Sequence, residues 1–466
     1  MRPFIDAAAG LTPAQQEAVS AEDPVLCLLA GAGAGKTRVL TLRVGRRVHD
    51  GSARPERTLV CTFSRKAADE LRRRLWALDA GREVRAGTFH RTALQLLRQY
   101  HDDRGRPPPT VLPDRRALLA TVLAEAGSGG RGTARSPKVG QAENEIGWAK
   151  ARLVGPEEYE EEARRHRRRP PMGPARMAEL YARYEEARRR QRVLDLDDLL
   201  WECADVLADD PRFAAAVRWR NRHLFVDEMQ DVNPAQFRLL RLLVGDEPDL
   251  FVVGDPNQSV YGWNGADPGL LDRLPTVFPD ARVLRLDENH RCSPQVVAVA
   301  AAALGLAEAV GPTSSRSDGT VPRLTDHATD ADEARWVARQ AWLAHRPGRR
   351  WSDIAVLART NQQLTVLTQA LGDERVPFRL AERAAGPASD LRVRPAGGGS
   401  LSVQADGGQG SRAGGRDDRS GPTGTTAGWP GTGSAGVAGT GTGGNGADED
   451  NRDAVVLTTF HRAKGL

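Results

Sequence analysis

Several residue types are scarce in this sequence of 466 residues, and each shortage argues against a class of protein. The four cysteines are scattered at positions 27, 61, 203 and 292, with neither a CxxC pair nor a histidine at metal-ligand spacing. This pattern favours free thiols in a reducing compartment over a zinc site or a disulfide framework. No apolar run approaches the roughly 18 residues that a membrane-spanning helix needs, and the first residues lack the apolar stretch of a signal peptide. We therefore expect a cytoplasmic protein with no membrane partner.

Lysine is also rare, because it occurs only at positions 36, 66, 138, 150 and 464 among 66 basic residues. Heavy use of Arg, Ala and Gly is typical of GC-rich coding, so the excess of arginine alone says little about nucleic-acid binding. A lysine that persists against this bias indicates a place where the chemistry needs an ammonium rather than a guanidinium group.

The remaining composition, 40% hydrophobic and 27% charged, is that of a globular protein long enough for two to four domains. Short apolar runs at 24–33, 57–63, 221–228 and 248–255 are typical of buried strands, and helical patterns follow the first two of them. This alternation of strands and helices predicts an α/β fold in which helices cover mainly parallel sheets.

Changes in composition along the chain suggest the domain boundaries. Residues 101–190 turn to Pro-rich loops and Arg/Glu-rich helices, which we interpret as a helical insertion. Residues 385–452 are dominated by Gly, Ser, Thr, Ala and Arg, a composition that cannot bury a core and predicts disorder. Because the last residues break off in mid-motif, we expect a truncated product. The predicted division is 1–100 and 191–280 for the first α/β domain, 101–190 for its insertion, 281–384 for the first part of a second α/β domain, 385–452 for a low-complexity linker, and 453–466 for the start of the rest of the second domain.

The sequence AGAGAGKT follows the strand at 24–33 and opens a helix at Lys36. Small residues let the backbone N–H groups of such a loop close around phosphate oxygens at a helix N-terminus. Lys36 can then reach the β- and γ-phosphates, and the Thr37 hydroxyl can bind Mg²⁺. We therefore predict an ATP site with Mg²⁺ as cofactor. The other residues expected to line it are Ala30, Gly31, Ala32, Gly33, Ala34, Gly35 and Arg38.

A second motif, VDEMQD, ends the very apolar strand at 221–228 with two acidic residues. An acidic pair at a strand end is common and is usually solvated. Next to a phosphate-binding loop, however, Asp227 is placed to help hold Mg²⁺, and Glu228 is placed to orient and deprotonate the attacking water.

The order of these and further motifs resembles that of superfamily 1 DNA helicases of the UvrD/PcrA/Rep type, over nearly the whole chain outside the Gly-rich segment. The resemblance implies two RecA-like motor domains that close around ATP and move along single-stranded DNA. The further segments that carry it are LTPAQQEAV (11–19), TFSRKAA (62–68), TFHR (88–91), LDLDDLL (194–200), VGDPNQSVYGWNGA (253–266), LDENHRCSP (286–294), ARTN (358–361) and TTFHRAKGL (458–466).

The resemblance also implies roles for individual residues at the ATP site. Gln15 would read the adenine edge, Gln258 would lie near the γ-phosphate, and Arg291 would act as an arginine finger from the second motor domain. His290 stands where the family usually has a tyrosine that stacks on adenine. An imidazole can still stack there, but it offers a smaller face.

Single-stranded DNA would be held by aromatic faces and polar side chains on top of both motor domains. Base stacking on aromatic rings supports this for Tyr261 and Trp263, which stand two residues apart. Core packing is the alternative for Phe63 and Trp263, and an interior position is the alternative for His90. The residues expected to contact DNA are Phe63, His90, Tyr261, Trp263, Asn361 and His461.

We therefore predict an ATP-dependent DNA helicase, of 3′-to-5′ polarity by resemblance, in DNA repair or recombination. Its partners would be single-stranded and partly duplex DNA, together with repair or nuclease proteins. The family places a helical subdomain where this chain has its Gly-rich segment. Two alternatives consequently stay open: a non-unwinding, DNA-stimulated ATPase or motor subunit of a helicase–nuclease complex, and an inactive nucleotide-binding fragment.

Overall fold

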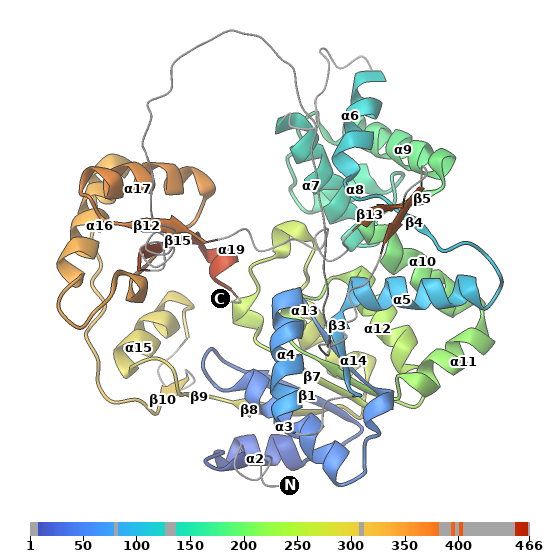
Figure 1. Cartoon of the computed structure of the whole chain (residues 1–466), viewed down its shortest axis with the longest axis horizontal. Helices are drawn as coiled ribbons and strands as arrows, with labels where there is room; N and C mark the ends of the chain where they lie inside the picture. Colours follow the sequence, from blue (N-terminus) through green and yellow to red (C-terminus); the bar gives the residue numbers. More distant parts are fainter. Residues whose placement is uncertain are drawn as a thin grey trace, which may run out of the picture. The chain divides into compact units, whose positions relative to one another are not determined.

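A computed structural model describes the chain over seven ranges, and these residues form two compact units (Figure 1). The first unit contains the described residues up to Thr325 together with 393–396 and 400–403, and the second contains 326–381 and 453–464. The Gly-rich segment predicted to be disordered lies outside the described residues, apart from the antiparallel strands β13 (Val393–Ala396) and β14 (Ser400–Val403). The described ranges are 8–78, 83–125, 137–306, 312–381, 393–396, 400–403 and 453–464.

The first unit is organised around a six-stranded sheet with the order β3-β2-β6-β7-β1-β8, in which every neighbouring pair is parallel. This confirms the prediction of an α/β fold with parallel strands. The strands are β1 (Val25–Ala30), β2 (Thr58–Thr62), β3 (Arg85–Thr88), β6 (His223–Val226), β7 (Leu250–Gly254) and β8 (Arg282–Leu286).

Helices cover both faces of this sheet (Figure 1), which explains why its central strands are apolar throughout. Side chains alternate between the two faces, so Val25 and Cys27 of β1 join one apolar core while Leu26 and Leu28 join the other. The first core is closed by α5 (Phe89–Asp102), α10 (Leu196–Asp209), α11 (Pro211–Arg220) and α12 (Pro234–Val244), and the second by α2 (Pro13–Ser20), α3 (Lys36–His49) and α4 (Arg65–Ala77).

A helical group interrupts the first unit between α5 and α10, in the region where the sequence predicts an insertion. Its helices enclose an apolar core of their own, centred on Trp148, Tyr159 and Tyr181. The chain enters and leaves this group through the short parallel strands β4 (Thr110–Val111) and β5 (Val193–Leu194). The helices are α6 (Arg115–Glu125), α7 (Pro137–Ala151), α8 (Tyr159–Arg165) and α9 (Pro174–Gln191).

Strand β8 lies where the sequence analysis begins a second α/β domain, yet it pairs with β1 as the edge strand of the first sheet. The sheet to which a strand belongs depends on pairing between residues far apart in the chain, here Leu26 with Arg282. The local sequence pattern therefore does not reveal to which sheet β8 belongs. The other segments of the first unit up to Thr325 are η1 (Pro55–Arg57), η2 (Met229–Asp231), η3 (Pro256–Gln258), η4 (Gly262–Asn264), α13 (Gly269–Asp272), α14 (Leu274–Val277), β9 (Glu288–Asn289), α15 (Pro294–Ala303) and β10 (Thr313–Ser314).

The second unit has a smaller parallel sheet with the order β11-β15-β12. Its central strand, β15 (Val455–Thr459), comes from the end of the chain and is buried through Val455 and Leu457. No helix in the described part of either unit is long and apolar enough to cross a membrane. The other elements of the second unit are α16 (Asp330–Ala344), η5 (Trp351–Asp353), β11 (Ala355–Ala358), α17 (Asn361–Asp373), β12 (Phe378–Leu380) and α19 (Phe460–Ala463).

Candidate functional site

Three strands of the first sheet end at the same edge, because parallel strands share one direction. β1 ends at Ala30, β6 at Val226 and β7 at Gly254. The turns that follow them carry the glycine-rich loop, the acidic pair and the segment that starts at Asp255. In open α/β sheets, ligands bind at this carboxyl edge.

The glycine-rich loop wraps around the side chain that follows it. The Lys36 ammonium donates to the backbone oxygens of Ala30, at 3.2 Å, and Gly31, at 3.3 Å. Lys36 is also the first residue of α3, so the loop and the helix N-terminus direct their N–H groups to the same side. Thr37 is the second residue of the same helix.

An amide that the sequence analysis did not single out fixes this loop from the other side. Asn289 is buried, and its Nδ2 donates to the Ala32 oxygen at 2.7 Å. Its Oδ1 accepts from the backbone N–H groups of Arg291 and Cys292, both at 2.8 Å. A Cβ atom at Gly33 would lie 2.7 Å from that oxygen, so only glycine allows the approach. The only signal for Asn289 in the sequence was its place between Glu288 and His290 in a recognised motif.

The two residues expected to meet the adenine lie next to each other. Gln15 is buried, and its Nε2 donates to the Ala34 oxygen at 3.0 Å and lies 3.4 Å from Nε2 of His290. Because the amide donates, this imidazole nitrogen accepts, and the other one, Nδ1, donates to the Ser315 hydroxyl at 2.7 Å. Thr12 caps α2: its hydroxyl accepts from the Gln15 backbone N–H. Its own backbone N–H donates to Oε1 of Gln15 at 3.2 Å, which fixes the position of the side-chain amide.

The two arginines predicted at this site are both exposed. Arg291 follows β9, and its Cβ would lie 2.8 Å from a Cβ atom at Gly33, so its backbone adjoins the glycine-rich loop. Arg38 instead donates to the Ala9 backbone oxygen at 2.7 Å.

The acidic pair has one buried and one half-buried member. Asp227 is 4% exposed, and burial, with the neighbouring Glu228 charge as a second cause, raises the pKa of its carboxyl to about 7. Glu228 has a left-handed backbone conformation, with φ of 55° and ψ of 46°. A non-glycine residue in that conformation is uncommon and marks a locally constrained turn.

A buried amide connects this turn with the next strand. Gln230 is fully buried; its Nε2 donates to the Glu228 carboxylate, and its Oε1 accepts from the Asp255 backbone N–H at 2.9 Å. The Asp255 carboxylate accepts in turn from Nε2 of Gln258, at 2.7 Å. Glu228 and Gln258, both expected near the γ-phosphate, are thus joined through two intermediate residues. The sequence analysis quoted Gln230 inside VDEMQD but gave it no role.

Beyond Gln258 the chain reaches the predicted DNA-contacting aromatics. Tyr261 stacks on Phe63, with ring centroids 4.6 Å apart and planes 24° apart. Trp263 is 50% exposed, so half of its side chain is open to solvent. The core packing that remained as an alternative for Trp263 is therefore not what the structure shows.

Comparisons with known proteins agree with this arrangement. The family model described as the UvrD/REP helicase N-terminal domain matches residues 11–279, and the UvrD-like helicase C-terminal domain matches residues 284–385. This chain belongs to the UvrD/REP helicase family.

The chain is similar to several curated helicases of this family. It is 37% identical to the ATP-dependent DNA helicase UvrD2 of Mycobacterium tuberculosis (strain ATCC 25618 / H37Rv) over 388 residues, which cover 80% of this chain and 55% of the relative. It is 30% identical to the ATP-dependent DNA helicase PcrA of Leuconostoc citreum over 381 residues, 80% of this chain and 50% of the relative. The chain thus spans about half the length of the curated relatives it matches.

In this UvrD/REP chain, His90 was predicted to contact DNA, but the structure buries it. His90 is 5% exposed, its Nε2 has no hydrogen-bond partner among the described residues, and Asp197 Oδ1 is 4.0 Å away. Burial lowers its pKa below the usual value. The alternative interpretation, an interior histidine, therefore fits the structure better than a DNA contact. A pattern such as TFHR does not reveal that the second residue of α5 faces inward.

The two remaining DNA-contact candidates belong to the second unit. Asn361 is exposed at the first position of α17, directly after the Thr360 cap. His461 lies in α19, which follows β15. Both stand at the carboxyl ends of strands of the smaller sheet, and their contact with DNA stays a prediction.

The burial of His90 predicts a pH-dependent stability. The folded chain disfavours the imidazolium that an unfolded chain forms below about pH 6.5, so the unfolding free energy falls as the pH drops below that value. The largest slope for one such group is about 1.4 kcal/mol per pH unit. Urea unfolding at intervals of about one pH unit between pH 5 and pH 8 measures this pH dependence of the unfolding free energy. We expect His90→Gln to flatten this dependence and the exposed control His49→Gln to leave it unchanged; equal slopes for wild type and His90→Gln would contradict the assignment.

Proposed function

We propose that this chain is the motor of an ATP-dependent DNA helicase, which hydrolyses ATP at the carboxyl edge of the first sheet and moves along single-stranded DNA. The observation that carries the proposal is the hydrogen-bonded path from Glu228 through Gln230 and Asp255 to Gln258, three residues before the Tyr261 ring. The segment from Asp255 to Tyr261 would thereby contact both the phosphates of ATP and the DNA. Membership of the UvrD/REP family supports the same conclusion.

The residues around the glycine-rich loop account for ATP binding. Gln15 and His290 would hold the adenine, one by its polar edge and the other by its ring face. Backbone N–H groups of residues 31–37 and the Lys36 ammonium would hold the phosphates. Arg291 would reach the γ-phosphate from the segment that Asn289 fixes beside the loop.

The residues present fit Mg²⁺, which prefers oxygen ligands. Asp227 supplies a buried carboxylate whose raised pKa reflects a site that disfavours an uncompensated negative charge, and Thr37 supplies a hydroxyl. These two residues would hold the ion, which supplies charge neutralisation at the phosphates when bound.

Hydrolysis would depend on the chain's own carboxylate and amides. Glu228 would orient the attacking water and accept its proton. Gln230, by donating to that carboxylate, would hold it in one orientation, and Gln258 would sense the γ-phosphate. Because Gln258 and Tyr261 lie in one short segment, a shift at the phosphates would move the aromatic ring that meets the DNA.

The finer predictions extend this proposal. They comprise 3′-to-5′ movement, a role in repair or recombination with repair or nuclease partners, a cytoplasmic location, and DNA contacts by Phe63, Tyr261, Trp263, Asn361 and His461. The division into two motor domains with a helical insertion belongs to the same proposal.

The assignment of Glu228 predicts a separation of binding from turnover. We expect Glu228→Gln to lower the ATP turnover number by about 10²–10⁴-fold, the usual contribution of a positioned base, while ATP affinity is kept. Steady-state phosphate release and fluorescent-nucleotide titration measure the two quantities. Glu125→Gln, an exposed change at the end of α6, should leave both at wild-type values.

A strand-separation assay beside this ATPase assay distinguishes the helicase from its alternatives. DNA-stimulated turnover without unwinding would favour a non-unwinding translocase, and unchanged turnover in Glu228→Gln would overturn the site assignment.

The amide bridge predicts a selective loss of rate. Gln230→Leu keeps the volume of the side chain but removes the donor to Glu228 and the acceptor for Asp255. Because a displacement of about 1 Å at a catalytic group costs about 10²-fold, we expect the turnover number to fall by that order while KM for ATP changes little. Gln191→Leu, at the exposed end of α9, is the matched control. A Gln230→Leu variant that is stably folded and keeps wild-type turnover would contradict the bridge.

A further inference from the structure

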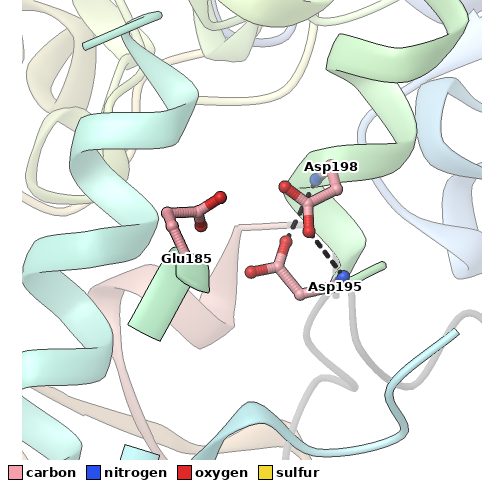
Figure 2. Close-up of side chains that lie close together, drawn as sticks. All are labelled: Glu185, Asp195 and Asp198. Carbon is pink, nitrogen blue, oxygen red and sulfur yellow. Dashed lines mark hydrogen bonds between the residues drawn. The ribbon is translucent and has the colours of Figure 1, made fainter. Parts of the chain in front are cut away.

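A buried cluster of charges lies where the helical insertion joins the first sheet's helices. Figure 2 shows its three carboxylates, Glu185 of α9 together with Asp195 and Asp198 at the N-terminus of α10, facing one another. The two aspartates also cap α10 reciprocally, each accepting from the other's backbone N–H. Three buried carboxylates this close need a positive charge among them.

Two cations supply that charge. One is Arg188 of α9, which is buried and forms ion pairs with Glu185 and Asp198. The other is Lys150, near the end of α7, which reaches all three carboxylates. Its Nζ lies 2.6 Å from Glu185, 2.8 Å from Asp195 and 2.7 Å from Asp198, and the residue is only 2% exposed. The ammonium donates hydrogen bonds to Asp195 and Asp198, and its contact with Glu185 is an ion pair. The ammonium therefore takes the position that a metal ion would need, and the cluster is an ion-paired joint between α7, α9 and α10 rather than a metal site.

The same turn of α7 supports the aromatic segment predicted to meet DNA. Gly265 closes that segment with a left-handed φ of +92°, and a Cβ atom there would lie 2.5 Å from Ala151 Cβ. Its backbone N–H donates to the Gly262 oxygen, which completes the turn around Trp263. Gly265, the end of this segment, thus rests directly on Ala151, the residue that follows Lys150.

A second contact fixes this turn independently of the ion pairs. The Trp201 indole N–H of α10 donates to the Lys150 backbone oxygen at 2.8 Å. The side chain and the backbone of Lys150 are therefore both held by α10. A rotation or shift of this turn would displace the surface on which Gly265 lies.

We propose that Lys150 is a positioning residue for DNA binding: through the Glu185–Asp195–Asp198 cluster it fixes the α7 turn that holds Tyr261 and Trp263 in their DNA-binding positions. The proposal rests on the proposed function. Lys150 itself is buried and touches no DNA. It acts on the aromatic segment through Ala151 and Gly265.

The test compares Lys150→Met with Lys138→Met, which removes the same charge from an exposed position of the same helix. Fluorescence anisotropy with a labelled oligo-dT strand gives the DNA affinity at several salt concentrations. We expect Lys150→Met to weaken binding by about tenfold or more, equivalent to losing about one stacked base, and Lys138→Met to bind like wild type.

The salt dependence separates positioning from direct contact. A lysine that neutralised a phosphate would lower the slope of log affinity against log salt by about 0.7 for a single strand, whereas Lys150→Met should keep the wild-type slope. ATP turnover without DNA should also stay at its wild-type value. The DNA concentration for half-maximal stimulation should rise together with the dissociation constant.

A second variant, Trp201→Phe, tests the proposal if loss of the buried ammonium prevents Lys150→Met from folding. It removes only the hydrogen bond to the Lys150 backbone oxygen. We expect a smaller loss of DNA affinity of the same kind. Wild-type DNA affinity in both variants, or a parallel loss of DNA-free turnover in both, would overturn the proposal. Failure of the wild-type chain to bind oligo-dT would instead overturn the proposed function.

Discussion

The parallel direction of the six strands is the constraint on which the rest of the first unit depends. It brings the ends of β1, β6 and β7 to one edge, although Ala30 and Gly254 lie 224 positions apart in the sequence. The glycine-rich loop, the acidic pair and the Asp255 segment therefore become neighbours in space, although they lie far apart in the sequence. Helices on both faces bury the strands, which gives this edge a rigid support.

Two buried amides turn this edge into a connected site. Asn289 ties the glycine-rich loop to the segment that carries His290 and Arg291, and Gln230 ties Glu228 to Asp255. An amide suits both places because it donates and accepts at once and adds no charge to a buried region. Under the proposed function, movement at bound phosphates would have a short route to the aromatic segment.

Much of this could be predicted from the sequence, for identifiable reasons. Apolar strands, a loop ending in Lys36 and an acidic pair after β6 carry local signals of strong physical meaning, and the ordered motifs identified the family. The edge position of β8 and the burial of His90 depend on contacts between distant segments, so local pattern did not reveal them. The roles of Gln230, Asn289 and Lys150 were missed because an amide or ammonium becomes informative only when its partners are known.

The central claim is that one sheet edge couples ATP to DNA, and binding linkage tests it most directly. The affinity for a non-hydrolysable ATP analogue is measured with and without saturating oligo-dT, and the affinity for oligo-dT with and without the analogue. Coupled sites must change each other's affinity by the same factor, and we predict about fivefold or more. Binding of both ligands with no mutual effect would contradict the account.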